Sequence, residues 1–289
     1  MPAGGIFEDV PPTFEELNVV ALRCREEEHI MRYGENKWPD VPDQAGKVVV
    51  LPLGSMEQHG HHLPLLTDTI ICQEVVRRAE ATLGDEALFL PAVWVGVSEH
   101  HRGFPGTVSV QPRTYVRLLS DMMESLIGSG FRRIVLLNAH GGNDLPGRTA
   151  VYETQMRHGE RRDLWLVFAT WYTVAAPQIA ALPMLQQKWV THSCELETSA
   201  VLRLRPELVD MEAARGAAID FESAFYTPDS SRASRVSIVR PFEQVSETGA
   251  YGHPELATAE KGEAILAAAA GEVVACVREV ATWPALQPT

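Results

Sequence analysis

The chain has 289 residues, of which 45% are hydrophobic and 22% charged, a composition typical of a globular protein with a large core. Its formal net charge of −13 argues against nucleic acids and anionic membranes as partners, because both attract positively charged surfaces. No apolar run approaches the ~18 residues of a membrane helix, and the first residues lack the features of a signal peptide, so we expect a cytoplasmic protein. The four cysteines form no CxxC pair and predict neither a disulfide framework nor a thiolate zinc site.

Strand-like runs alternate with helical periodicity along the chain. After a predicted helix over residues 14–34, short apolar runs predict strands over 47–53, 87–93, 132–138 and 163–170. Helical spacing predicts helices over 68–83, 113–128 and 144–158, another from near Glu195, and a last one over about 257–281. The alternation favours an α/β fold with a mostly parallel central sheet. We expect a single domain over residues 1–289, with a helical lead-in over 1–45.

The region 205–255 is the least clear part of the pattern. A short hairpin around 235–245 is one expectation. The region as a whole fits either a loop over the functional site or a contact between copies of the chain.

Chemically active residues gather directly after the predicted strands. In open parallel sheets, ligands bind beyond the carboxyl ends of the strands. The first strand is followed by GSMEQHGHHLPLLTD, the second by SEHHRGFPGT, the third by NAHGGN, and the fourth by Trp171. Histidines and carboxylates at three strand ends therefore predict one shared site.

The residue types in these loops suit a metal ion. Imidazole nitrogens and carboxylate oxygens are ligands for Zn²⁺ and Mn²⁺. Glu57 and His59, two apart, face the same side of an extended segment, and Asp68 begins the next helix. Alone, each could be a surface charge, a satisfied polar group or a helix cap, but the set favours a metal site. His140, beside two glycines, is the next candidate ligand.

Five motifs in order carry a resemblance to a known family. They are GSMEQHGHHLPLLTD, EHHRGFPGT, NAHGGN, HSCELETS and GAYGHPELATAEKG, and they extend from Leu51 to about Gly262. The chain resembles the creatininase (creatinine amidohydrolase) family. The resemblance implies a three-layer α/β/α fold and a homo-oligomer, a hexamer or a dimer. It also implies two divalent metal ions per chain, Zn²⁺ or Mn²⁺, with Fe²⁺ as a further choice.

The resemblance also implies roles for single residues. The positions that match metal ligands of the family are Glu57, His59, Asp68 and His140. Asp68 would bridge the two ions, and His192 resembles the catalytic histidine. Gly142 stands where creatininase itself has a glutamate that completes the second metal site. We expect Glu195 to supply that carboxylate and Glu197 to support the site or the helix start, although the two could be exchanged.

These features predict a dinuclear metal-dependent hydrolase. The ions would activate water and polarise a carbonyl, and His192 would move a proton to the leaving group. We expect a small polar cyclic amide or formamide as substrate, with hydrolytic opening of a keto-inositol ring as the alternative. The residues expected to contact substrate or support the ligands are Glu99, His100, His101, Gly141, Gly142, Asn143, Trp171 and Glu197. Competing hypotheses are a non-catalytic metal-binding or small-molecule-binding protein, and catalysis by Cys194 as a nucleophile beside His192.

Overall fold

The structure is a computed structural model that describes residues 33–187, 189–217 and 223–287. These residues belong to one compact unit that extends from Met31 to Thr289. The predicted helix over residues 14–34 lies almost entirely outside the described residues. Before the first strand the chain forms three short 3₁₀ turns, Tyr33–Glu35, Trp38–Asp40 and Pro42–Gln44.

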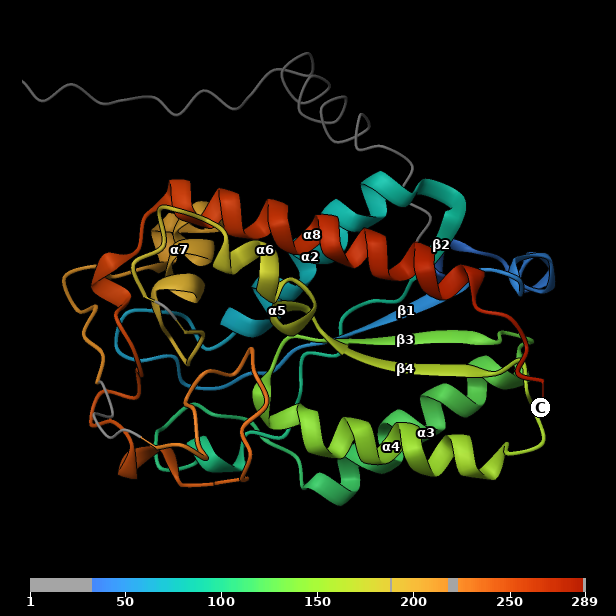
Figure 1. The fold of residues 1–289 in the computed structure, drawn as a ribbon, viewed down its shortest axis with the longest axis horizontal. Helices are drawn as coiled ribbons and strands as arrows, with labels where there is room; N and C mark the ends of the chain where they lie inside the picture. The colour runs from blue at the N-terminus through green and yellow to red at the C-terminus, as the bar shows by residue number, and fades with distance from the viewer. Residues whose placement is uncertain (1–32, 188, 218–222, 288–289) are drawn as a thin grey trace, which may run out of the picture. The chain divides into compact units, whose positions relative to one another are not determined.

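A four-stranded sheet lies at the centre of the unit (Figure 1). Its strands are β1 (Val48–Leu53), β2 (Ala87–Phe89), β3 (Arg133–Asn138) and β4 (Trp165–Thr170). They pair in the order β2-β1-β3-β4, and every pairing is parallel, which confirms the predicted sheet. β2 is shorter than the predicted 87–93, because this edge strand soon reaches Pro91, which has no N–H to donate.

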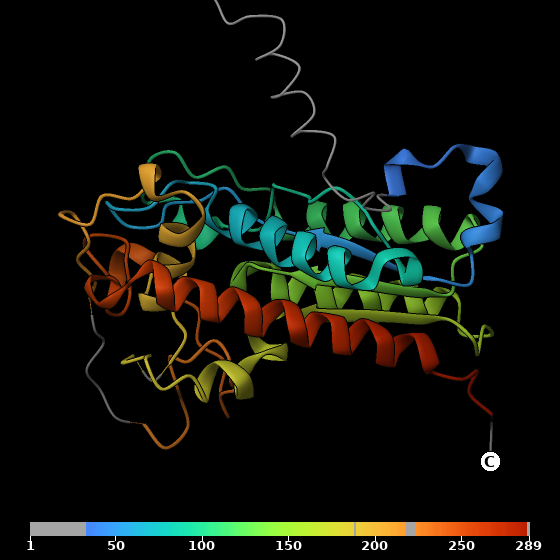
Figure 2. The ribbon, with the colours of Figure 1, turned by 90° about the horizontal axis from the view of Figure 1, so that it is seen from above.

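Helices cover both faces of the sheet (Figures 1 and 2). They are α2 (Thr67–Leu83), α3 (Pro112–Gly128), α4 (Asp144–Arg157), α5 (Trp171–Val174), α6 (Ala176–Ala180), α7 (Glu195–Leu204) and α8 (Ala259–Thr282). Alternate residues of β1 point to opposite faces. Val48 and Val50 join the apolar core under α2 and α8, whereas Val49 and Leu51 join the core under α3. The predicted three-layer architecture is therefore confirmed, while α5 and α6 were not predicted.

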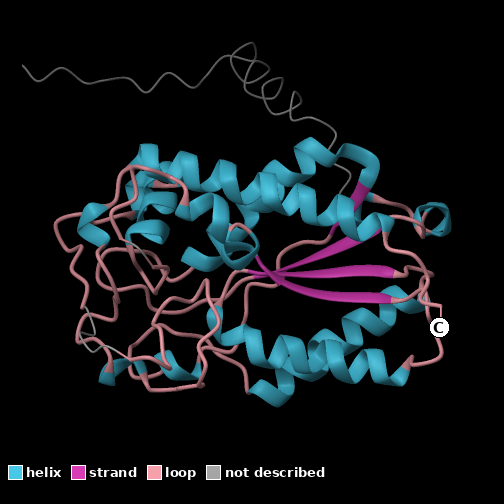
Figure 3. Ribbon diagram, viewed as in Figure 1, coloured by secondary structure: helices cyan, strands magenta, loops and turns pink. Residues whose placement is uncertain are grey.

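Long loops gather at the carboxyl ends of the strands (Figure 3). The hairpin predicted around 235–245 is wrong: residues 223–250 contain no strand, only the 3₁₀ turn Phe242–Gln244. Arg235 N–H donates to the Phe225 carbonyl, but Ser234 Oγ occupies both the N–H and the carbonyl of Thr227, so no strand ladder continues. None of the helices in the described ranges is long and apolar enough to cross a membrane.

Candidate metal centre and adjoining cavity

Three carboxylates and several imidazoles meet beyond the carboxyl ends of β1 and β3. Glu57 and His59 follow β1, Asp68 lies in the first turn of α2, His140 follows β3, and Glu197 lies in the first turn of α7. All five side chains are buried. Each of these segments leaves the same edge of the sheet, which is why residues up to 140 positions apart in the sequence lie together.

Asp68 is the centre of the cluster. Its Oδ1 lies 3.2 Å from His59 Nε2, and its Oδ2 lies 3.1 Å from His140 Nδ1. On one side, Glu57, Asp68 and His140 form a group whose ligand atoms lie within 4.8 Å of one another. On the other side, His59, Asp68 and Glu197 form a second such group. Asp68 belongs to both groups, so it is placed to bridge two ions.

Neighbouring polar groups orient these side chains. His59 Nδ1 donates to the carbonyl of Glu57 at 3.1 Å, which leaves Nε2 to face Asp68. Ser55 Oγ donates to Asp68 Oδ2 at 2.6 Å. Asn138, at the end of β3, accepts from the N–H of His140 and donates to its carbonyl. Such second contacts fix the ring and carboxylate orientations that a metal site requires.

The charges of the cluster would be balanced better by a bound cation than by its own side chains. Glu57 is fully buried, and its carboxylate oxygens make no hydrogen bond of good geometry, although His101 Nε2 and His140 Nε2 each lie 3.2 Å from one of them. A buried carboxylate without such hydrogen bonds is costly unless a positive charge compensates it. Burial raises the pKa of Glu197 to about 7. Burial disfavours charge on His59 as well, but the Asp68 carboxylate outweighs it and raises the pKa of His59 to about 9. Protons thus occupy positions that a divalent ion would take.

His192 lies at the edge of this cluster with one nitrogen facing it. Its Nε2 lies 2.8 Å from the carbonyl of Gln58, to which it donates, and its Nδ1 lies 3.6 Å from Glu57 Oε1. Burial, together with the nearby His59, lowers the pKa of His192 to about 3, so Nδ1 carries no proton at neutral pH. The next residue, Ser193, has a φ of 56°, a left-handed conformation that side chains rarely adopt and that often marks functional sites.

His101 and Gln58 support the cluster from behind. Gln58 Nε2 lies 2.8 Å from His101 Nδ1 and 2.9 Å from the carbonyl of Gly249. Because Nδ1 of His101 accepts, its proton lies on Nε2, which faces Glu57 Oε1 at 3.2 Å. His101, predicted to contact substrate or support the ligands, therefore orients a carboxylate. Gln58 was missed, although its position between Glu57 and His59 was the available signal.

Glu195 does not join the cluster. Its carboxylate pairs with Lys261 of α8 and accepts the backbone N–H groups of Gln186 and Gln187, so it faces away from the imidazoles. Of the three groups of described residues able to hold an ion, one contains Glu197, none contains Glu195, and the third consists of Glu57, His59 and His192. Residues two apart on a helix point about 200° apart, so only one of the two can face the site. The expectation that Glu195 is the fifth ligand is corrected in favour of Glu197.

The NAHGGN turn is held by close backbone contacts. Asn143 accepts from Val97 N–H at 2.9 Å and donates to the carbonyl of Gly54 at 3.0 Å, so it joins two loops and does not face the cluster. A Cβ at Gly142 would lie 2.1 Å from the Val97 carbonyl oxygen, whereas the nearest atom to one at Gly141 lies 3.6 Å away. There is no space for a side chain at position 142, so this turn cannot offer a carboxylate to the cluster from that position.

Two other sequence candidates lie in the core. Trp171 is buried and lines neither cavity described below, but it packs edge-on against Tyr172, which lines the smaller one, so of its two expected roles the structure favours support over substrate contact. Cys194 is fully buried, and burial raises the pKa of its thiol to about 11. A protonated, inaccessible thiol does not act as a nucleophile.

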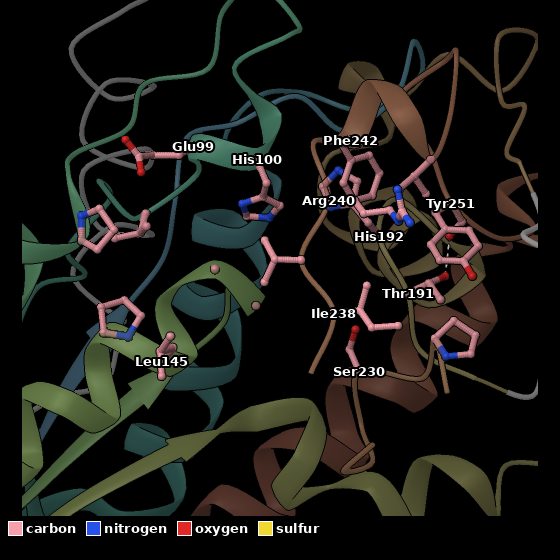
Figure 4. A pocket seen from close by; sticks show the side chains of 18 of the residues that line it. Glu99, His100, Leu145, Thr191, His192, Ser230, Ile238, Arg240, Phe242 and Tyr251 are labelled. Carbon is pink, nitrogen blue, oxygen red and sulfur yellow. Dashed lines mark hydrogen bonds between the residues drawn. The ribbon is translucent and has the colours of Figure 1, made fainter. Parts of the chain in front are cut away.

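Two adjoining cavities give access to the cluster, and Figure 4 shows the larger of them. A small one of about 110 Å³ lies over Glu57, Asp68 and Glu197. A larger one of about 730 Å³ adjoins it, and Glu99 and His100 lie on its wall. Both are lined by His100, Gly141, Thr191, His192, Ser230 and Phe242. Residues of the 223–250 loop line the larger cavity, which favours the expectation of a loop over the site.

The arrangement is that of an α/β protein with a buried carboxylate-imidazole cluster beyond the carboxyl ends of its parallel strands. The family model for creatininase, described as creatinine amidohydrolase, matches residues 34–277. The mycofactocin precursor peptide peptidase of Mycobacterium tuberculosis is 35% identical over 243 residues, which are 81% of this chain and 85% of that protein. The creatinine amidohydrolase of Pseudomonas putida is 28% identical over 263 residues, 85% of this chain and 95% of that protein.

The fold matches solved structures of the same kind. A crystal structure of creatinine amidohydrolase superposes with a TM-score of 0.71 and 25% identity, over 89% of this chain and all of that one. Two further solved creatininases are described as a Mn form and as a Zn–Zn form. A 3-dehydro-scyllo-inosose hydrolase of Thermotoga maritima is 34% identical, but over only 32% of this chain and 30% of that protein. The chain belongs to the creatininase family and is a hydrolase.

Proposed function

We propose that this hydrolase cleaves an amide C–N bond within a peptide and uses two divalent ions, Zn²⁺ or Mn²⁺. The observation that carries the proposal is the cavity of about 730 Å³ that opens onto the carboxylate-imidazole cluster. Ligand pockets of roughly 300–1,000 Å³ enclose drug-sized molecules, so this one is generous for a single small ring. The 35% identity to a peptidase supports the same choice. The proposal replaces the small polar cyclic substrate expected from the sequence.

Five side chains would hold the ions. Glu57 and His140 would bind one, His59 and Glu197 the other, and Asp68 both. When bound, such ions polarise the substrate carbonyl and lower the pKa of water. The second contacts of Ser55, Asn138 and His101 keep the ligands in place before substrate arrives, so no reorganisation is needed during the reaction.

His192 supplies the proton transfer in this proposal. Its Nε2–H is occupied by the carbonyl of Gln58, so the ring cannot turn over, and its unprotonated Nδ1 faces the cluster. Nδ1 accepts a proton from the attacking water and passes it to the leaving amine nitrogen. The same residue lines both cavities, so it lies where a substrate that fills them would be cleaved.

A cyclic amide is the second candidate substrate, favoured by the 28% identity to a creatinine amidohydrolase. Gly142 argues against creatinine itself, because the second metal site would be completed by Glu197 of α7 and not by a glutamate in the NAHGGN turn. The keto-inositol alternative has less support, since the corresponding relative matches only 32% of this chain.

A metal-reconstitution assay tests the proposal. The full-length protein is stripped with a chelator, reloaded with Mn²⁺ or Zn²⁺, and incubated with a mixture of synthetic peptides and, separately, with creatinine. Mass spectrometry should find peptide cleavage that disappears on stripping and returns with metal, and no conversion of creatinine. Cleavage that survives complete metal removal, or conversion of creatinine without peptide cleavage, would contradict the proposal.

A further inference from the structure

The larger cavity has an apolar wall, and three of its six side chains are exposed. We define the apolar groove as Val116, Leu145, Pro146, Ile238, Val239 and Val245. Leu145 is 76% exposed, Ile238 47% and Val239 83%, although each is a large aliphatic residue. Single exposed apolar residues are ordinary, but several that line one concave surface mark a place where an apolar group binds.

The groove is formed by parts of the chain that are far apart in sequence. Figure 4 shows Leu145, at the start of α4, across the cavity from Ile238 of the 223–250 loop. Tyr226 and Phe242 of the same loop line the cavity too, so the loop presents apolar side chains at several positions. The charged side chains that line it are Glu99, Arg113 and Arg240. The six side chains of the groove itself are aliphatic, so the groove suits an apolar group.

The groove is continuous with the candidate metal centre. His100, His192 and Phe242 line both the groove's cavity and the smaller cavity over Glu57 and Asp68. A molecule with its scissile amide beside His192 would therefore extend directly into the groove. This continuity distinguishes an occupant bound during the reaction from a protein that merely covers an apolar surface.

We propose that the apolar groove binds an apolar side chain of the peptide substrate, on a residue adjacent to the amide that is cleaved. This inference rests on the proposed peptidase function and adds its substrate class: peptides with an aliphatic or aromatic residue at that position. Burial of such a side chain makes the free energy of binding more favourable in proportion to the apolar area removed from water. A polar residue at the same place would lose its hydration without a partner.

A competition experiment tests the inference on the metal-loaded, full-length enzyme. The substrates are four pentapeptides, acetyl-Gly-Gly-X-Gly-Gly-amide, with Leu, Phe, Asn or Asp at X, mixed at equal concentration. Mass spectrometry of the products gives the ratios of kcat/KM and shows which bond next to X is cut. We expect the Leu and Phe peptides to be cleaved at least about tenfold faster than the Asn peptide.

Two matched variants locate the effect. Val239→Asp places a charge in the groove and should reduce the Leu-to-Asn ratio by at least about tenfold. Val236→Asp changes the same residue type in the same loop, 43% exposed and outside the cavity lining, and should leave the ratio unchanged. Both sites are exposed in the chain, so neither substitution should prevent folding.

The outcomes separate the two proposals. Cleavage of all four peptides at equal rates would overturn the groove assignment while leaving the peptidase function standing. Cleavage of none would overturn the peptidase function; calorimetric binding of the Leu and Asn peptides, to wild type and to Val239→Asp, then decides the groove. Equal binding of both peptides overturns it. The groove assignment is also overturned if Val239→Asp loses self-association in ultracentrifugation while its peptide preference is unchanged. The occupant of the groove would then be a second copy of the chain.

Discussion

Glu195 and Glu197 lie two residues apart, and the structure gives them opposite roles. The pair Glu195→Gln and Glu197→Gln tests this directly, because each change removes one carboxylate and keeps the size of the side chain. Glu195 forms a buried ion pair with Lys261, a residue that is only 8% exposed. Glu197 lies in the candidate metal centre, and among the described residues its basic partner is His59, at 4.0 Å.

The expected magnitudes differ for a physical reason. Removing one partner of a buried ion pair costs about 3–5 kcal/mol, because the other charge stays buried alone. Lys261 keeps its bond to the Leu256 carbonyl, so we expect Glu195→Gln to lose about 3 kcal/mol, or roughly 6–12 °C in Tm. Burial raises the pKa of Glu197 to about 7, so without metal this group is already half neutral near pH 7. Glu197→Gln should therefore change the free energy of unfolding of the metal-free protein by less than about 1 kcal/mol, and its Tm correspondingly little.

The assay combines calorimetry with metal analysis. Scanning calorimetry of the metal-free variants gives Tm, and elemental analysis after loading with Mn²⁺ and dialysis gives ions per chain. Glu195→Gln should unfold earlier yet retain two ions, whereas Glu197→Gln should keep its metal-free Tm and retain one. The double variant Glu195→Gln/Lys261→Met should recover part of the lost stability, since no buried charge is left unpaired. A Glu195→Gln protein that loses an ion at unchanged Tm would refute the reasoning.

Three further predictions concern the same region. Gly142→Ala should lower Tm and metal content, because its Cβ would lie 2.1 Å from the Val97 carbonyl oxygen. The control Gly141→Ala should resemble wild type. Equal Tm values for the two variants would contradict this, because the backbone of the turn would then have moved to accept the Cβ. Loading both sites of the metal-free protein with Zn²⁺ at pH 7.5 should release about two protons, because nearby carboxylates raise the pKa of His59 to about 9 and the pKa of His140 well above its ordinary value, and affinity should rise with pH; calorimetry in two buffers of different ionisation enthalpy measures this, and zero release would contradict it. Cys194→Ala should retain at least about half of the peptidase activity, because burial raises the pKa of that thiol to about 11, and a loss of over about 100-fold would restore the nucleophile hypothesis.

Some features of the sequence prediction stay untested. The homo-oligomer implied by the family resemblance remains a prediction, as does the cytoplasmic location. The single-domain boundary remains one too, since residues 1–32 lie outside the described ranges. The number of ions per chain belongs to the proposed function, and the loading experiment above measures it directly.

Local sequence determined the elements and most of the cluster. β1, β3 and β4 were predicted to within two residues because apolar runs with flanking turn residues define strands locally. Glu57, His59 and His140 could be named because they lie in the loops that follow β1 and β3, and Asp68 because it begins the helix after the first of these loops; parallel strands deliver their carboxyl ends to one edge.

Tertiary contacts decided the remaining assignments, because each depends on a partner far along the chain. Glu195 faces away from the cluster because Lys261, 66 positions later on α8, neutralises it there, and helix geometry then turns Glu197 inward. Trp171 is a core residue because α5 packs against α8, about 90 positions later in the chain. The apolar groove exists only where the 223–250 loop lies across the cavity from Leu145. Periodicity and spacing describe a residue's own element, whereas the direction a side chain faces is set by what packs against that element.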